Sequence, residues 1–217
     1  MSGMIERIDA FIFYFDLVGV MDQFIEKQED TLERLRGFQA KARSSFPLGG
    51  PHSGIKTLAD NVWARVNADE NIADVRTLEL AAHAMKAAEE FGFPKYFGAI
   101  TRGDHTFDLA DRTTVTGADP TDFLVQHIDM TSEPHMRAAL AEKWSAHLER
   151  EKRRPIPVQS VWVGAEVFPD GEIEENFFGM TLPYVIRPER FDLKTVPGPR
   201  GKKWPFEHSK FRAISLR

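Results

Sequence analysis

The chain has 217 residues, a net charge of −5 and 42% hydrophobic residues, a length and composition suited to one domain with its own core. It contains no cysteine, which excludes disulfide bonds, cysteine-ligated metals and thiol catalysis, so any metal must be held by oxygen atoms or imidazoles. No apolar run approaches the ~20 residues that span a bilayer, and the N-terminus lacks the layout of a secretory signal. We therefore expect a cytoplasmic protein with no membrane partner.

The charge is unevenly distributed along the chain. Residues 187–217 carry nine Lys and Arg against three Asp and Glu. We divide the chain into a main domain, 1–186, and a basic C-terminal extension, 187–217, that belongs to the same domain. The extension could bind phosphates, nucleic acid or an acidic partner, although a solvated surface explains it equally well.

The first predicted element is a strand over residues 8–15 that ends at Asp16. Nearly all its side chains are apolar, and many are aromatic or β-branched, which is typical of a central strand buried on both faces. Apolar residues then recur at intervals of three and four from Met21 to about residue 42, which predicts an amphipathic helix.

A hairpin is predicted next, after a loop rich in Pro and Gly over residues 44–54. Its strands are residues 55–58 and 62–66, and Asp60 lies in the turn between them. Asp74 then begins a predicted helix as its N-cap.

A second hairpin is predicted from strands at residues 96–101 and 106–109, joined across Arg102-Gly103-Asp104. A further strand is expected at residues 123–128. Ser132 is predicted to cap the next helix, and a strand over residues 158–168 follows it. The buried stripe expected for that helix is Met136, Leu140, Trp144 and Leu148. This order of elements predicts an α+β fold, a ferredoxin-like palm whose antiparallel-rich sheet carries helices mainly on one face.

Two carboxylates stand out as candidate metal ligands. Asp16 ends a buried strand, and Asp60 lies at the tip of a hairpin that can pair beside that strand. Carboxylates converging from adjacent strand ends make an oxygen-only site for Mg²⁺ or Mn²⁺, which in turn binds phosphate oxygens. Residues Val18, Gly19 and Val20 lie at the start of the predicted helix, where main-chain amides favour phosphate groups.

Three segments resemble class III nucleotidyl cyclases, in the order found in that family. Residues 15–19 (FDLVG) resemble its first metal-binding strand, and residues 55–60 (IKTLAD) resemble its second metal segment, in which a base-facing Lys precedes the Asp by four residues. Residues 98–104 resemble the hairpin that follows. The chain departs from the family at Phe97, where Arg is usual, and at Ala59, where Gly is common.

The resemblance implies a palm fold, a homodimer with active sites at its interface, and two divalent ions per site, Mn²⁺ or Mg²⁺, that bind a nucleoside triphosphate. It also implies attack of the ribose 3′-oxygen on the α-phosphate. The implied metal ligands are Asp16, Asp60 and the carbonyl of Leu17. Arg137 matches the arginine that stabilises the transition state, although Glu133 replaces the Asn that usually precedes it by four residues.

The base is read in this resemblance by Lys56 and Gln126. This pair can recognise the edge of uracil as well as that of adenine, because Gln both donates and accepts while Lys donates. The small chain also resembles the bacterial Pycsar pyrimidine cyclases, which make cyclic UMP or cyclic CMP in antiphage defence. We therefore expect a uridylate cyclase that uses UTP.

Three alternatives stay open. The first is an adenylate cyclase that makes cyclic AMP, favoured by the match at Ile55-Lys56-Thr57. The second is a catalytically degenerate module that binds a nucleotide or a protein, suggested by Phe97 and Glu133. The third is a nucleic-acid-binding module that uses residues 187–217 and would bind in a salt-sensitive way, although we do not expect nucleic acid as the main partner.

Overall fold

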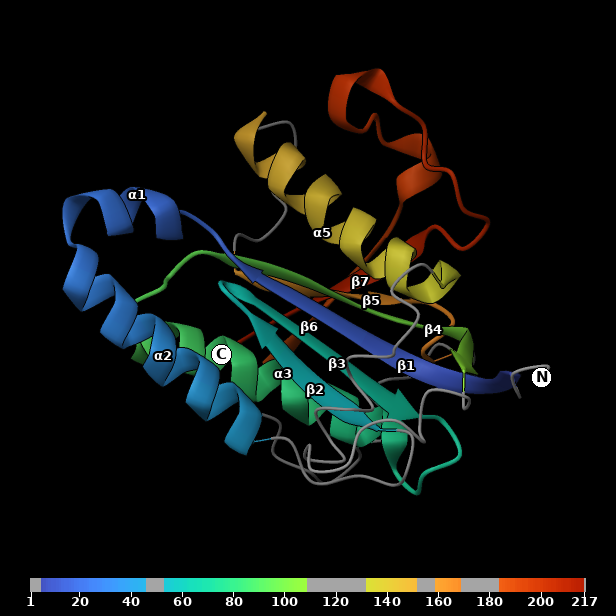
Figure 1. Cartoon of the computed structure of the whole chain (residues 1–217). Helices are drawn as coiled ribbons and strands as arrows, with labels where there is room; N and C mark the ends of the chain where they lie inside the picture. The colour runs from blue at the N-terminus through green and yellow to red at the C-terminus, as the bar shows by residue number, and fades with distance from the viewer. Residues whose placement is uncertain (1–4, 46–52, 109–131, 152–158, 169–183, 217) are drawn as a thin grey trace.

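A computed structural model describes residues 5–45, 53–108, 132–151, 159–168 and 184–216 (Figure 1). Its strands are β1 (Ile5–Leu17), β2 (Gly54–Leu58), β3 (Asn61–Asn67), β4 (Tyr96–Asp108), β5 (Ser160–Gly164), β6 (Tyr184–Asp192) and β7 (Lys210–Leu216). Within the described ranges they form one seven-stranded sheet in the order β2-β3-β1-β4-β5-β7-β6. Only β4 and β5 pair in parallel there; the other neighbours are antiparallel.

The helices cover both faces of this sheet. Helices α2 (Gln28–Ser44) and α3 (Ala73–Glu90) pack on one face, and α1 (Val20–Glu26) precedes α2. Helix α5 (Glu133–Arg150) crosses the opposite face. Two short 3-10 turns, η2 (Leu193–Thr195) and η3 (Pro199–Gly201), lie between β6 and β7. The predicted α+β fold with an antiparallel-rich sheet is confirmed.

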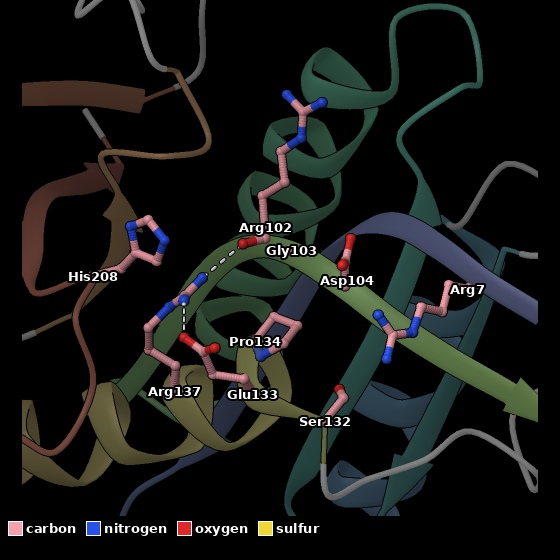
Figure 2. Close-up of a pocket in the computed structure, with 9 residues that line it drawn as sticks. All are labelled: Arg7, Arg102, Gly103, Asp104, Ser132, Glu133, Pro134, Arg137 and His208. Atoms are coloured by element: carbon pink, nitrogen blue, oxygen red, sulfur yellow. Dashed lines mark hydrogen bonds and ion pairs between the residues drawn. The ribbon is translucent and has the colours of Figure 1, made fainter.

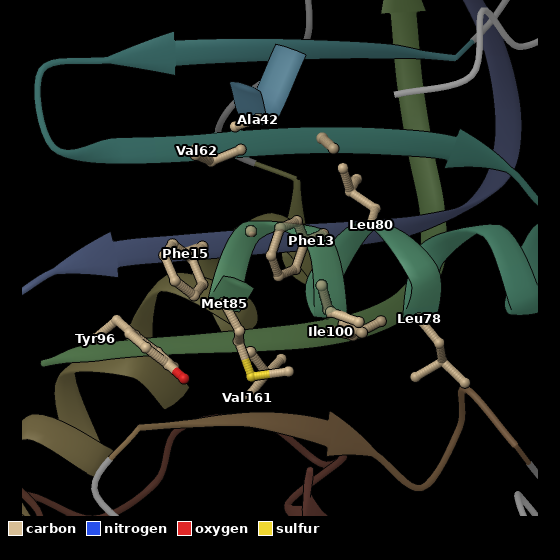
Figure 3. Close-up of a cluster of buried hydrophobic side chains, with 14 of the residues drawn as sticks. Phe13, Phe15, Ala42, Val62, Leu78, Leu80, Met85, Tyr96, Ile100 and Val161 are labelled. Carbon is tan, nitrogen blue, oxygen red and sulfur yellow. The ribbon is translucent and has the colours of Figure 1, made fainter. Parts of the chain in front are cut away.

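The core is divided by β1, whose side chains alternate between the two faces. Phe11, Phe13 and Phe15 point toward α2 and α3, and Figure 3 shows Phe13 and Phe15 there among side chains of α3, such as Met85. Ile12 and Tyr14 point toward α5. Asp16 continues the second series, so its carboxylate belongs to the face that α5 covers. No helix in the described ranges is both long and apolar enough to cross a membrane.

The helix predicted from Met21 to residue 42 is two helices. Lys27 has φ −145° and ψ 72°, values outside the helical region, and separates α1 from α2. Met21 is 65% exposed and Ile25 is 77% exposed, so these two members of the predicted stripe do not reach the core. The stripe does continue in α2, where Phe38 is fully buried.

The second predicted hairpin is also wrong. Residues 96–108 form a single strand, β4, which pairs with β1 over its whole length, from Tyr96 opposite Leu17 to Asp108 opposite Ile5. The sequence Arg102-Gly103-Asp104 therefore lies inside a strand. Long antiparallel pairing with a 13-residue partner satisfies the main chain that a turn would have satisfied locally.

The predicted helix caps are only partly correct. Ser132 occupies the N-cap of α5, but its hydroxyl makes no capping hydrogen bond. Asp74 lies in the first turn of α3 and accepts a hydrogen bond from the Val75 amide at 2.8 Å, while Ile72 is the N-cap, with φ 56°. Asp74 was predicted as the N-cap because its carboxylate can accept a main-chain hydrogen bond. The main chain leaves the helical conformation two residues earlier, at Ile72.

Helix α5 buries a different stripe from the one predicted. Met136 is 42% exposed, whereas Trp144 and Leu148 are buried as expected. The buried set also includes His135, Arg137, Ala138, Ala141, Glu142 and Ser145. Charged side chains therefore face inward from this helix. The predicted strand at residues 123–128 lies outside the described residues, as does Gln126.

Candidate functional site

Asp16 lies near the end of β1, where it is opposite Asn61 on β3 and Phe97 on β4. Phe97 is 1% exposed and places an apolar ring where the family resemblance expects a guanidinium. The Asp16 carboxylate is partly buried, and its Oδ1 has no hydrogen-bond partner among the described residues. A buried carboxylate oxygen without a donor is costly, and a bound cation would compensate for it.

Asp60 is held beside Asp16 by the main chain of the hairpin tip. The Leu17 amide donates to the Asp60 carbonyl at 3.1 Å, and Gln39 Nε2 donates to the Ala59 carbonyl at 2.6 Å. Ala59 itself has φ 50°, in the left-handed region that favours glycine. The family resemblance expects glycine there, and Ala59 adopts a backbone conformation that glycine takes more readily.

The two carboxylates influence each other's charge. Burial and, after it, the nearby Asp60 charge raise the pKa of Asp16 to about 7, while Lys143 opposes the shift. Burial and the Asp16 charge raise the pKa of Glu142 on α5 to about 8. Burial and then the charges of Asp16 and Glu142 raise the pKa of the Tyr14 hydroxyl well above its usual value. The site therefore concentrates negative charge under α5.

Asp16 and Asp60 fit a divalent cation. Within the described residues, no group of three or more His, Asp or Glu side chains is arranged to hold a metal ion, so these two carboxylates would bind it together with other oxygen ligands. Mg²⁺ is commonly bound in this way, by one or two carboxylates completed by water and substrate phosphates. The repulsion between the carboxylates and the unpartnered Oδ1 of Asp16 both favour such an ion.

The candidate phosphate-binding residues follow Asp16 directly. Gly19 has φ 80° and is the N-cap of α1, and a Cβ there would meet no atom within 4 Å. The Val18 amide donates to the Lys95 carbonyl at 2.9 Å, so this N–H is already occupied. Val20 is buried, so only its main chain can approach a ligand.

Lys56 shares the α5 face with Asp16. It is opposite Trp63 in the β2–β3 pair, and Trp63 is opposite Tyr14 in the β1–β3 pair. Side chains of directly paired residues lie on the same face of a sheet, so Lys56, Tyr14 and Asp16 all point to the face that α5 covers. Lys56 is partly exposed and can reach a ligand at that end of the sheet.

Arg137 lies in a separate place, at the start of α5. Its guanidinium donates to Glu133 at 2.9 Å, to Glu166 at 2.8 Å and to the Arg102 carbonyl at 2.7 Å, and its side chain is only 2% exposed. Figure 2 shows it between Glu133 and the main chain of Arg102. A pocket of about 380 Å³ opens there, lined among others by Arg7, Arg102, Ser132, Glu133, Arg137 and His208.

The structure does not bring Arg137 to Asp16 within one chain. Asp16 is opposite Phe97, whereas Arg137 contacts the carbonyl of Arg102, five residues farther along β4. Five residues of strand extend roughly 17 Å. A single α-phosphate bound to both residues therefore requires two chains or a rearrangement of α5.

Sequence reasoning missed Tyr14, Asn61 and Glu142. The hydroxyl of Tyr14 donates to Asn61 Oδ1, and Asn61 Nδ2 donates to Asp60 Oδ1 at 2.9 Å. The spacing of His135, Ala138, Glu142 and Ser145 is helical and would have placed Glu142 on the buried face of α5. The hydrogen bond from Tyr14 to Asn61 had no sequence signal, because it depends on the register between β1 and β3.

No protein-family model and no curated protein matches the sequence. The structure is similar to the guanylyl cyclase Cya2, with a TM-score of 0.60 and 11% identity, covering 100% of this chain and 96% of that one. The adenylyl cyclase CyaB from P. aeruginosa is similar with a TM-score of 0.57 and 14% identity, covering 99% and 97% of the two chains.

A third similar structure is the guanylate cyclase domain of RhGC from Catenaria anguillulae in complex with GTP, with a TM-score of 0.58 and 11% identity. It covers 98% of this chain and 99% of that one. Identities this low establish the fold alone. The chain has the α+β fold of class III nucleotidyl cyclase domains.

Proposed function

We propose that this protein is a nucleotidyl cyclase, a lyase that converts a nucleoside triphosphate to its 3′,5′-cyclic monophosphate and pyrophosphate. The observation that carries this proposal is the meeting of Asp16 and Asp60 at one end of a cyclase-like sheet. The Leu17 amide joins the two segments through the Asp60 carbonyl. The fold and the acidic site are independent observations, and both support the same chemistry.

Asp16, Asp60 and the Leu17 carbonyl would hold two divalent ions, Mn²⁺ or Mg²⁺. When bound, these ions would lower the pKa of the ribose 3′-hydroxyl and neutralise triphosphate charge. The substrate's 3′-oxygen then forms a bond to the α-phosphorus, the bond to the bridging oxygen breaks, and pyrophosphate leaves while the hydroxyl proton passes to solvent. The main-chain amides of Gly19 and Val20 would bind the phosphates, whereas the Val18 amide is unavailable because it donates to the Lys95 carbonyl.

Arg137 is proposed as the residue that stabilises charge on the α-phosphate. Its distance from Asp16 along β4 supports a homodimer in which each site combines Asp16 and Asp60 of one chain with Arg137 of the other. Two such sites form together under twofold symmetry. For this role the guanidinium must exchange at least one of its bonds to Glu133 and Glu166 for a phosphate oxygen.

UTP is the substrate we propose, with a role in bacterial antiphage defence in the cytoplasm. Lys56 and Gln126 would read the base, and the orientation of Lys56 on the α5 face supports its part in this. The main alternative is an adenylate cyclase that makes cyclic AMP.

The purified protein incubated with Mn²⁺ and each of ATP, GTP, CTP and UTP in turn tests the proposal directly. We expect one 3′,5′-cyclic nucleotide by mass spectrometry, cyclic UMP on the proposed specificity, and none from Asp16→Ala. Asp60→Ala should also abolish the product while the circular dichroism spectrum stays unchanged. Retained turnover in Asp60→Ala would remove Asp60 from the mechanism.

A catalytically degenerate nucleotide-binding module is the second candidate. The burial of Phe97 beside Asp16 and the neutralisation of Arg137 by two carboxylates favour it. This candidate predicts that a nucleoside triphosphate raises the melting temperature without forming any cyclic product. Finding such stabilisation with all four nucleotides inert would replace the cyclase proposal.

A further inference from the structure

A chain of hydrogen bonds connects the buried face of β1 to the Asp60 carboxylate. The Tyr14 hydroxyl donates to Asn61 Oδ1, and Asn61 Nδ2 donates to Asp60 Oδ1 at 2.9 Å. Tyr14 and Asn61 are 47 residues apart in the sequence and meet because β1 pairs with β3. The register places Asn61 opposite Asp16, and its amide donates to the Asp60 carboxylate, so Asn61 adjoins both candidate metal ligands.

The direction of these bonds fixes the amide of Asn61. An Asn side chain has an acceptor end and a donor end, and turning it by half a rotation exchanges them. Because the Asp60 carboxylate can only accept, the amino group of Asn61 must face it, which leaves Oδ1 to accept from the Tyr14 hydroxyl. Without that hydroxyl, Oδ1 loses its donor and the amide is no longer held at its far end, so it can swing away from the carboxylate.

Tyr14 is itself fixed by packing. Its side chain is 8% exposed, and its ring centroid lies 4.0 Å from that of Trp63. The other side of this layer is closed by His135 on α5, whose ring stacks on Trp63 with centroids 4.1 Å apart. A donor held by packed rings on a central strand keeps one position, as an orienting group for a binding site requires.

The hydrogen bonds from Tyr14 to Asn61 and from Asn61 to Asp60 hold the Asp60 side chain, whereas other hydrogen bonds hold its main chain. The hairpin tip is held at the Asp60 carbonyl by Leu17 and at the Ala59 carbonyl by Gln39. Among the described residues, the hydrogen bond from Asn61 is the one that reaches the Asp60 carboxylate. The main chain therefore places Asp60, while Asn61 sets the direction of its carboxylate.

We propose that Tyr14 and Asn61 are positioning residues that orient the Asp60 carboxylate toward a divalent cation. This inference rests on the proposed cation site at Asp16 and Asp60 and adds two residues behind it. Partners behind metal ligands commonly change metal affinity by about 10- to 100-fold when removed. Tyr14 and Asn61 act through Asp60, so their removal should weaken cation binding without removing the site.

Mn²⁺ binding tests the inference without any turnover. The free Mn²⁺ signal in electron paramagnetic resonance gives the dissociation constant for wild type, Asp60→Ala, Tyr14→Phe, Asn61→Ala and the double variant. We expect about tenfold weaker binding for each single positioning variant. Because both act through one carboxylate, Tyr14→Phe should add less than twofold in the Asn61→Ala background, a non-additivity that a general packing defect would not give.

Tyr96→Phe is the matched control. Tyr96 is a buried tyrosine on the neighbouring strand, but it points to the opposite face and donates to Glu89 at 3.2 Å. Its removal should change the Mn²⁺ dissociation constant by less than twofold. Thermal unfolding of every variant shows whether the fold is intact, and if Tyr14→Phe fails to fold, Asn61→Ala alone decides the result.

The outcomes separate the two proposals. If Asp60→Ala binds Mn²⁺ as wild type does, the cation site itself is absent and both proposals fall. If Asp60→Ala loses Mn²⁺ while Tyr14→Phe and Asn61→Ala bind within twofold of wild type, the cation site stands and the positioning role is overturned. Tenfold weakening in both single variants with no further loss in the double variant supports it.

Discussion

At the scale of single residues, the site under α5 contains acidic side chains whose charged forms are disfavoured by burial. Burial raises the pKa values of Asp16 and Glu142, with a further contribution from the Asp60 charge at Asp16 and from the Asp16 charge at Glu142, to about 7 and about 8. Glu142 is 4% exposed, and Lys143 is the nearby cation that opposes both shifts. Functional sites tolerate buried charge of this kind, because the groups that bind a ligand can lower the stability of the unliganded protein.

These shifts predict how the stability of the metal-free protein depends on pH. A carboxyl group with a raised folded-state pKa binds its proton more tightly in the folded chain than in the unfolded chain. Its contribution to stability is therefore complete below the unfolded pKa of ~4 and is lost as the pH rises through the folded pKa. We expect the free energy of unfolding to fall between pH ~4 and ~8 in the presence of EDTA.

Glu142→Gln should reduce that loss, because it removes one of the two titrating groups and its repulsion of Asp16. Urea unfolding at pH 5, 7 and 9 measures the difference. Glu149→Gln on the same helix is the control and should keep the wild-type pH dependence. An identical pH dependence in Glu142→Gln would show that its carboxyl does not take up a proton in this range.

At the scale of elements, α5 is fixed on its outer side by the connection between β6 and β7. The rings of Trp144 and Trp204 meet edge to face with centroids 5.3 Å apart, and Trp144 Nε1 donates to the Val196 carbonyl at 3.4 Å. Gly198 lies so close to Trp144 that a Cβ would come within 1.9 Å of its ring. The connection between β6 and β7, which is part of the basic C-terminal extension, therefore packs over the helix that carries Glu142.

Gly198→Ala should destabilise the protein by about 2 kcal/mol, because either the Trp144 ring or the connection must move. The midpoint and slope of urea unfolding give this value. Lys203→Ala changes an exposed side chain in the same connection and should shift stability by less than about 0.5 kcal/mol. Equal stabilities of the two variants would mean that the connection can shift away from the Trp144 ring at little cost in free energy.

Sequence patterns predicted the local elements well where one periodicity dominated. The apolar run of β1 and the Asp-Asn turn before β3 predicted a central strand and a hairpin, and both are present. Patterns failed where distant pairing decided the outcome, as in β4, which passes through Arg102-Gly103-Asp104 because β1 pairs with it throughout. The bond from Tyr14 to Asn61 was unpredictable for the same reason.

At the scale of the whole molecule, the two halves of the proposed site lie at different places on one chain. Asp16 and Asp60 meet at one end of the sheet, and Arg137 lies beside Arg102, roughly 17 Å along β4. The proposed homodimer resolves this separation by joining the first half of one chain to the second half of its partner.

Mixing two inactive variants tests this arrangement. Asp60→Ala lacks the first half of the site, and Arg137→Lys lacks the planar guanidinium of the second half. Random exchange of chains makes half of the dimers mixed, and each mixed dimer contains one intact site of two, so we expect about a quarter of wild-type activity. Activity no higher than that of either variant alone would argue for sites contained within one chain.

The position of β1 in the sheet also governs how the chain folds. This apolar strand is the first described element, yet its partners are β3 and the distant β4, whose residues begin at Tyr96. During synthesis the edge of β1 that faces β4 stays unpaired until residues 96–108 have been made, a long-range closure of the kind that slows folding and exposes chains to aggregation. The β1–β3 pairing that brings Asp16 beside Asp60 can therefore form before β4 is made, whereas the other edge of β1 stays exposed until β4 follows.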